Sequence, residues 1–208
     1  MTQLSERIPE YGGVTFINWG RKSCPPTSKL IYEGQAAAPD YRTAGSGANY
    51  LCLPSDPQYD PKSPSKAHHS LLTKVWYEDI NYPSAFPGTP SIRHLVPCAV
   101  CEAVQRVTHA MIPAAVKCPS SEWTTEYKGY IMSSANIDKS SVKLTDHFSR
   151  TTFICVDENS ESFDSKPFTS YSGSPIFFTR VQCSGDGALG NCPPYKADKA
   201  LSCVFCTK

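Results

Sequence analysis

Two cysteine doublets carry the clearest potential chemistry in this sequence: VPCAVC at residues 96–101 and LSCVFC at residues 201–206. Four thiolates can hold a tetrahedral zinc ion, and a doublet at a helix N-terminus can exchange electrons. The doublets lie about a hundred positions apart, far outside zinc-ribbon spacing. Pro97 precedes Cys98 and no helical pattern follows, which disfavours a redox doublet. We therefore predict neither a metal nor a cofactor, and we interpret the doublets as oxidised cysteines.

Other residue types that support catalysis do not form recognisable motifs. The sequence contains no Gly-X-Ser-X-Gly stretch of the kind that presents a nucleophilic serine. The histidines show no metal-ligand spacing; they are His68, His69, His94, His109 and His147. His109 falls in an expected strand, where a packing role is the simpler interpretation. The prediction is a protein that is not an enzyme.

One loop region has the side chains that a sugar-binding site needs. Sugars bind an aromatic ring face together with acids or amides that reach their hydroxyl groups. The stretch HHSLLTKVWYEDIN at 68–81 places five such residues close together: Trp76, Tyr77, Glu78, Asp79 and Asn81. The alternative is that Trp76 fills the core and the acids are solvated, and we prefer it because large aromatic residues are usually buried.

Composition narrows the compartment and the partners. The chain has 208 residues, with 20 basic and 19 acidic residues and a formal net charge of +1. This balance disfavours nucleic acid as a partner, and no apolar run reaches the length that crosses a bilayer. Ten cysteines, 18 prolines and only 19% charged residues are typical of a secreted, loop-rich protein made in an oxidising compartment. We predict an extracellular, secreted protein.

The segments that must position these residues have the pattern of strands. Short stretches rich in β-branched and aromatic residues predict strands at 13–19, 29–34, 106–112, 151–157 and 175–183. No segment keeps an apolar period of 3.6 residues long enough for a helix. The expected fold is therefore all-β, with long loops at 53–70 and 157–174.

An internal repeat organises the cysteines. Each half has the order Cys-Pro, Tyr-X-Gly, aromatic-aliphatic-Cys and Cys-X-X-Cys, with nearly equal spacing from the third feature to the doublet. We expect an N-terminal extension at 1–13 and two pseudo-symmetric, disulfide-rich β subdomains at 14–105 and 106–208. Cys183 and Cys192 have no counterpart in the first half.

With these features the chain resembles the non-collagenous C-terminal domain of type IV collagen and the C-terminal domain of short-chain spongin collagens. The most specific match is PCAVCEAVQRVTHAMIPAAVKCPSSEWTTEYKGYIMSS at residues 97–134, which crosses the junction between the halves. The resemblance extends weakly from about Val14 to the C-terminus and is carried mainly by the cysteines. It departs from the family in the first half, which lacks that family's small local bridge.

The resemblance implies a disulfide pairing and a mode of assembly. The implied pairs are Cys24 with Cys101, Cys52 with Cys98, Cys118 with Cys206, Cys155 with Cys203, and Cys183 with Cys192. It also implies a homo-oligomer, most plausibly a trimer, that assembles extracellular matrix. The alternative is a soluble, multivalent lectin, whose weak sugar sites would gain avidity from the repeat or from the oligomer.

Overall fold

The computed structural model describes residues 12–41, 47–62, 71–78, 93–134, 151–164, 166–167, 172–186, 188–190, 192–197 and 199–208. These residues form strands, turns and bends, and none of them lies in a helix. The expectation of an all-β fold is therefore confirmed. In this part of the chain no helix is long and apolar enough to cross a membrane.

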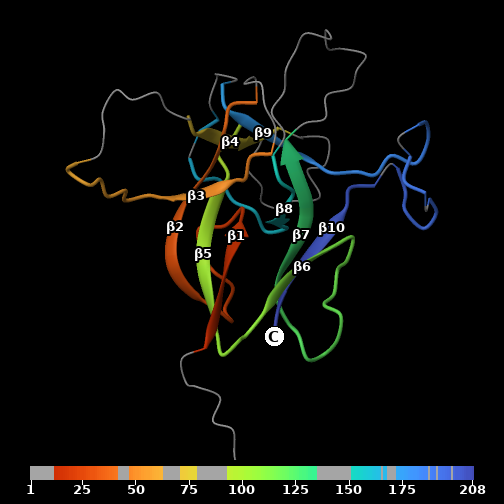
Figure 1. Ribbon diagram of the computed structural model, residues 1–208, viewed down its shortest axis with the longest axis horizontal. Helices are drawn as coiled ribbons and strands as arrows, with labels where there is room; N and C mark the ends of the chain where they lie inside the picture. The colour runs from red at the N-terminus through yellow and green to blue at the C-terminus, as the bar shows by residue number, and fades with distance from the viewer. Residues whose placement is uncertain are drawn as a thin grey trace, which may run out of the picture.

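Ten strands make one continuous sheet (Figure 1). They are β1 (Gly13–Trp19), β2 (Lys29–Ala38), β3 (Leu51–Pro54), β4 (Thr73–Tyr77), β5 (Pro97–Val104), β6 (His109–Pro113), β7 (Thr124–Ser134), β8 (Ile154–Asp157), β9 (Ser174–Phe178) and β10 (Ser202–Thr207).

Seven of these strands close into a barrel. The order β7-β8-β1-β5-β2-β4-β9 returns to β7, because β7 pairs with both β8 and β9. Two parallel contacts connect strands from the two halves of the chain, β1 with β8 and β4 with β9. The other three strands extend outward, with β10 and β6 continuing from β7 and β3 pairing with β2. The barrel is thus built by both halves together.

The interior of the barrel is a single apolar cluster. All seven barrel strands contribute side chains to it. Within a strand the contributing residues alternate, because every second side chain faces the same side of a sheet. Its members are Trp19, Ala36, Ala38, Tyr50, Cys52, Val75, Tyr77, Val96, Cys98, Met132, Ile154, Val156, Ile176 and Phe178. A second cluster packs on the other side of β1, β5, β7 and β8, around Phe16, Cys101, Tyr127 and Cys203.

The expected strands agree with the structure to different extents. The strand at 13–19 has the predicted bounds, and the one at 29–34 continues to residue 38. The strands expected at 151–157 and 175–183 are shorter, spanning 154–157 and 174–178. Residues after 178 leave the sheet and enter the loop closed by Cys183 and Cys192. Between 157 and 174 the described residues form no strand, and much of the 53–70 loop lies outside the described residues.

Candidate functional site

Five disulfides involve all ten cysteines. They join Cys24 to Cys101, Cys52 to Cys98, Cys118 to Cys206, Cys155 to Cys203, and Cys183 to Cys192. These are the five pairs that the resemblance implies. The four disulfides of the doublets link β5 and β10 each to two earlier segments of the same half. The cysteines of both doublets are fully buried. The doublets therefore have a structural role, and an oxidising setting follows from the disulfides.

Of the residues proposed for sugar binding, Trp76, Tyr77 and Glu78 lie within the described part of the chain. Trp76 and Tyr77 are buried side chains of β4, and the Trp76 Nε1–H donates to Glu78 Oε2 at 2.8 Å. Neither ring presents a face to solvent, in agreement with the preferred core interpretation of Trp76. Asp79 and Asn81 lie outside the described residues.

Two histidines fall within the described residues. His94 is buried, with its Nδ1 3.3 Å from Asp164 Oδ1. His109 is exposed on β6 and stacks on Phe205, with 5.4 Å between ring centroids. His68, His69 and His147 are not in the described ranges. Across those ranges, no three His, Cys, Asp or Glu side chains come close enough together to hold a metal ion.

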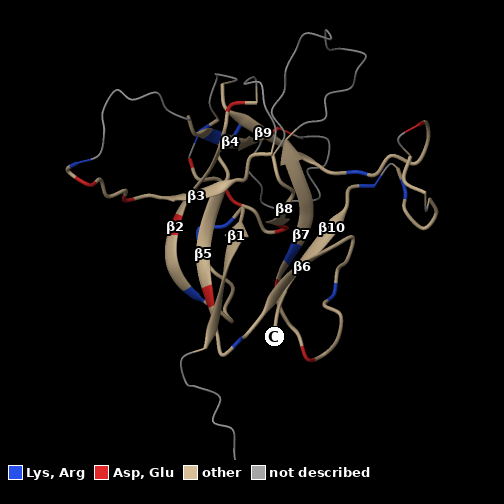
Figure 2. Ribbon diagram, in the orientation of Figure 1, with Lys and Arg blue, Asp and Glu red and all other residues tan. Residues whose placement is uncertain are grey.

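An apolar band of two rows crosses the sheet, and all of its side chains except the buried Tyr127 are at least partly exposed. The first row follows paired residues of β2, β5 and β1, which are Tyr32, Val100 and Ile17. The second row follows β7, β10 and β6 and consists of Tyr127, Phe205 and Met111. All six side chains line one groove of about 470 Å³. We call these six residues the apolar band. Among the described residues, basic and acidic residues are interspersed along the ribbon, as Figure 2 shows.

The two rows meet where Tyr127 reaches β1. Its hydroxyl lies 3.0 Å from the Ile17 carbonyl oxygen and 3.1 Å from the Cys155 carbonyl oxygen. Burial raises the pKa of this phenol well above its usual value, so the hydroxyl stays protonated and donates. Tyr32 begins the band at its other end and donates its hydroxyl to the Cys52 carbonyl at 3.1 Å. Tyr32 is 36% exposed, whereas Tyr127 is 6% exposed.

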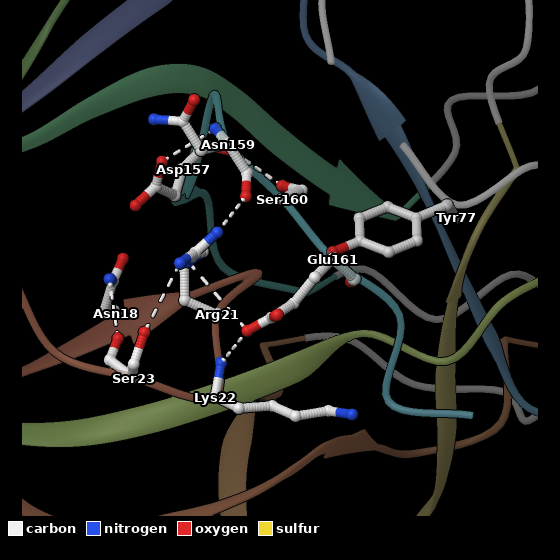
Figure 3. A network of polar contacts seen from close by, with 9 residues as sticks. All are labelled: Asn18, Arg21, Lys22, Ser23, Tyr77, Asp157, Asn159, Ser160 and Glu161. Atoms are coloured by element: carbon white, nitrogen blue, oxygen red, sulfur yellow. Dashed lines mark hydrogen bonds and ion pairs between the residues drawn. The ribbon is translucent and has the colours of Figure 1, made fainter. Parts of the chain in front are cut away.

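A polar network lies at the end of β1, where it meets the turn after β8 (Figure 3). Arg21 donates to the Asn159 carbonyl at 2.7 Å, and its Nε lies 3.9 Å from Glu161 Oε1. Glu161 also accepts the Lys22 backbone N–H at 2.5 Å. The Asn159 backbone N–H donates to Asp157 Oδ1 at 2.8 Å. This network connects residues that are far apart in the sequence and belong to different halves.

A pocket of about 520 Å³ opens beside this network. We call it the polar pocket; among its lining residues are Asn18, Arg21, Glu126, Lys128, Asp157 and Asn159. Glu126 is buried and accepts hydroxyl groups from Thr27 at 2.6 Å, Ser28 at 2.8 Å and Thr207 at 2.6 Å. The sequence did not indicate this pocket, because Asn18 and Asp157 lie in different halves and carry no shared motif.

Asp157 should destabilise the fold at neutral pH. Burial raises the pKa of its carboxyl group above 3.8, although the Asn159 N–H, the Asn18 amide and Arg21 act in the opposite direction. A raised folded-state pKa means that the fold is favoured by protonation, so stability is lost as pH rises through that pKa. We expect Asp157→Asn to raise the melting temperature at pH 7, because the amide keeps an acceptor for the Asn159 N–H without the buried charge.

Thermal unfolding of the variant and the wild type from pH 3 to pH 8 measures this effect. The advantage of Asp157→Asn should grow as pH rises above 3.8 and then level off. A variant that melts below the wild type at pH 7 would show instead that the carboxylate stabilises the network.

Comparison with known proteins adds no relative to these observations. No protein-family model matches the chain, and no curated protein matches it. The fold and the cysteines define the class of this protein as a disulfide-bonded, all-β barrel.

Proposed function

We propose that this protein is a secreted, self-associating extracellular module, related to the C-terminal domains of type IV collagen and spongin collagens. In this proposal each chain consists of two copies of one β unit, and chains associate head to tail into a homotrimer of the extracellular matrix. The disulfides support secretion, and the strand pairings of the two halves support the repeat and the interface.

The repeat is supported by matching register in the two halves. In the first half β5 pairs with β1 and β2, and β2 pairs in turn with β3 and β4. In the second half β10 pairs with β6 and β7, and β7 pairs in turn with β8 and β9. Gly34 pairs with Cys98 just as Gly129 pairs with Cys203. Both pairings contain a bulge at the same place, at the residue directly before the tyrosine: Ile31 before Tyr32 and Glu126 before Tyr127.

One difference between the halves carries the assembly proposal. Strand β8 contacts β1, and its side chains Ile154 and Val156 are 6% and 0% exposed. The same register positions of β3 hold Leu51 and Leu53, which are 47% and 40% exposed. Strand β3 thus has the apolar side chains of a covered strand but, among the described residues, no strand on its outer side. Such edges are prone to pair with another chain.

The strand that corresponds to β1 identifies the partner of this edge. Strand β6 is the counterpart of β1, because β6 pairs with β10 as β1 pairs with β5. Strand β3 is likewise the counterpart of β8. The counterpart of the β1–β8 contact is therefore a contact between β6 and β3. These two strands lie on opposite sides of the molecule in Figure 1. They can therefore meet only between copies, with β6 of one chain against β3 of the next. Repeating such a head-to-tail contact generates a closed ring when the rotation permits.

The apolar band is consistent with the same contact. Within one chain the Tyr127 hydroxyl donates to the Ile17 carbonyl of β1. Met111 occupies on β6 the register position that Ile17 occupies on β1. The hydroxyl of Tyr32, which already bonds Cys52, would gain the Met111 carbonyl of a second copy. The row that ends at Met111 in one chain would then continue at Tyr32 in the next.

Leu53→Lys tests this interface. A lysine on the outer edge of β3 would have to be desolvated against β6, and edge lysines are a known means of blocking strand pairing. We expect multi-angle light scattering to give a trimer mass for the wild type and a monomer mass for Leu53→Lys. The melting temperature at low protein concentration should be the same for both, because Leu53 is already exposed in the single chain.

Leu189→Lys is the matched control, since Leu189 is 44% exposed in the loop outside the sheet. It should remain a trimer. A wild type that is monomeric at every concentration, or a Leu53→Lys variant with the wild-type mass, would refute the proposed interface.

A further inference from the structure

The polar pocket contains an acceptor that the fold leaves unpaired. Asn18 is 2% exposed, and its Nδ2 donates to the Ser23 carbonyl at 3.2 Å. Its Oδ1 is buried and has no hydrogen-bond partner. Leaving a buried acceptor unpaired costs free energy, and few such groups remain in native proteins. Because Nδ2 already has an acceptor in Ser23, exchanging the two amide atoms would place two oxygens together.

A second acceptor faces the same space. Figure 3 shows the Asn18 amide and the Asp157 carboxylate directed toward one another from β1 and β8. The carboxylate is also buried, and Oδ1 accepts the Asn159 N–H. The Asn18 amide also lowers the pKa of Asp157 by a hydrogen bond to its carboxylate, which leaves the Asn18 Oδ1 and the second carboxylate oxygen as acceptors. A ligand group that donates hydrogen bonds would satisfy both.

The charges that line the pocket are of both signs, so they favour neither an anion nor a cation. The acidic residues are Glu126, Asp157 and Glu158, which would repel an anion. The basic residues are Arg21 and Lys128, which would repel a cation. Lys128 lies 3.2 Å from Glu158, so part of this charge is already paired within the pocket wall. A neutral ligand avoids both repulsions.

Hydroxyl groups satisfy this arrangement best. A hydroxyl donates one hydrogen bond and accepts others, so adjacent hydroxyls can donate to Asn18 and Asp157 while accepting from Arg21 or Lys128. The volume of about 520 Å³ is that of an ordinary small-molecule site. Pro25 and Pro26 line the pocket too and offer an apolar wall for ring C–H groups.

We propose that the polar pocket binds a neutral, hydroxyl-rich ligand of monosaccharide size, held by Asn18 and Asp157. This site is distinct from the residues at 76–81, whose aromatic rings are buried. The proposal does not depend on self-association, since the pocket is formed within one chain.

Amide-shift NMR on the isotopically labelled full chain tests the proposal. The probes are the methyl glycosides of glucose, galactose, mannose and N-acetylglucosamine. A carbocyclic polyol, myo-inositol, is included as a ligand without a sugar ring oxygen. We expect at least one probe to shift the amides of Ser23 and Asn159 with a Kd of about 1 mM, which is typical of a single small polar ligand. Asp157→Asn should weaken this Kd about tenfold, because a bond to a charged acceptor is the stronger kind.

Glu122→Gln is the matched control, because Glu122 pairs with Lys208 on the surface and does not line the pocket. It should leave the Kd unchanged. Methylamine, acetate and calcium chloride are titrated in parallel as a cation, an anion and a metal. The proposal is overturned if no polyol shifts these amides at tens of millimolar, if one of the charged probes binds more tightly, or if Asp157→Asn binds as well as the wild type. A glycoprotein array then distinguishes a free sugar from the end of a glycan.

Discussion

Gly129→Ala is expected to lower the free energy of unfolding by about 3 kcal/mol or more, at the upper end of overpacking effects. A Cβ atom at this position would lie 1.8 Å from the Val156 carbonyl oxygen and 2.7 Å from its carbon. Both are backbone atoms, so no side chain can move away to make room. Strands β7 and β8 would have to separate at the point where β8 also contacts β1.

Gly34→Ala should have a similar effect, because its Cβ would lie 1.9 Å from the Leu53 carbonyl oxygen. Chemical unfolding monitored by fluorescence compares both variants with Gly190→Ala, whose added Cβ meets nothing within 4 Å. Two glycines with equal effects would support the proposed repeat. A Gly129→Ala variant as stable as Gly190→Ala would contradict the close approach of β7 and β8.

Removing the Cys155–Cys203 disulfide by paired alanine substitutions is expected to cost about 4 kcal/mol from the closure of its loop alone. The two cysteines are separated by 48 positions, and both are buried. The lost sulfur atoms also leave space in a packed cluster, which adds to the cost. At this size the effect would consume much of the stability of an ordinary domain.

The Cys183–Cys192 disulfide provides the comparison within the same chain. It closes a loop of only nine positions outside the sheet, so its removal should cost about 2.5 kcal/mol or less. Denaturant titrations of the two double variants, under conditions that keep the other disulfides oxidised, measure the difference. Equal losses for both variants would show that loop closure and burial do not set the contribution of these disulfides.

The sequence was most informative where local pattern and pairing agree. The strand at 13–19 alternates between residues of the two apolar clusters, such as Phe16 and Trp19, and its bounds were predicted correctly. The all-β class follows from similar short stretches. The strand at 124–134 was not predicted, because charged residues and Gly129 interrupt its apolar pattern. Gly129 is there because β7 and β8 approach closely, a requirement that only the three-dimensional fold reveals.

The candidate surfaces depend on contacts that the sequence does not display. Tyr32 and Tyr127 stand in the same Tyr-X-Gly motif, yet only Tyr127 is covered, by β1 and β8 of the barrel. Likewise, nothing in the sequence places Asn18 beside Asp157. Trp76 and Tyr77 belong to a cluster of sugar-binding residue types, yet they lie in the buried strand β4, as the preferred core interpretation of Trp76 expected.

The disulfides also bear on the order in which the chain can mature during synthesis. The four long disulfides each join cysteines of the same half, so the first half has all its oxidation partners once Cys101 has emerged. Its two crosslinks can form while the second half is still being made. Barrel closure must wait, because β8 and β9 come later in the chain. Biosynthesis would therefore pass through a crosslinked but open first half, with its apolar interior awaiting the second.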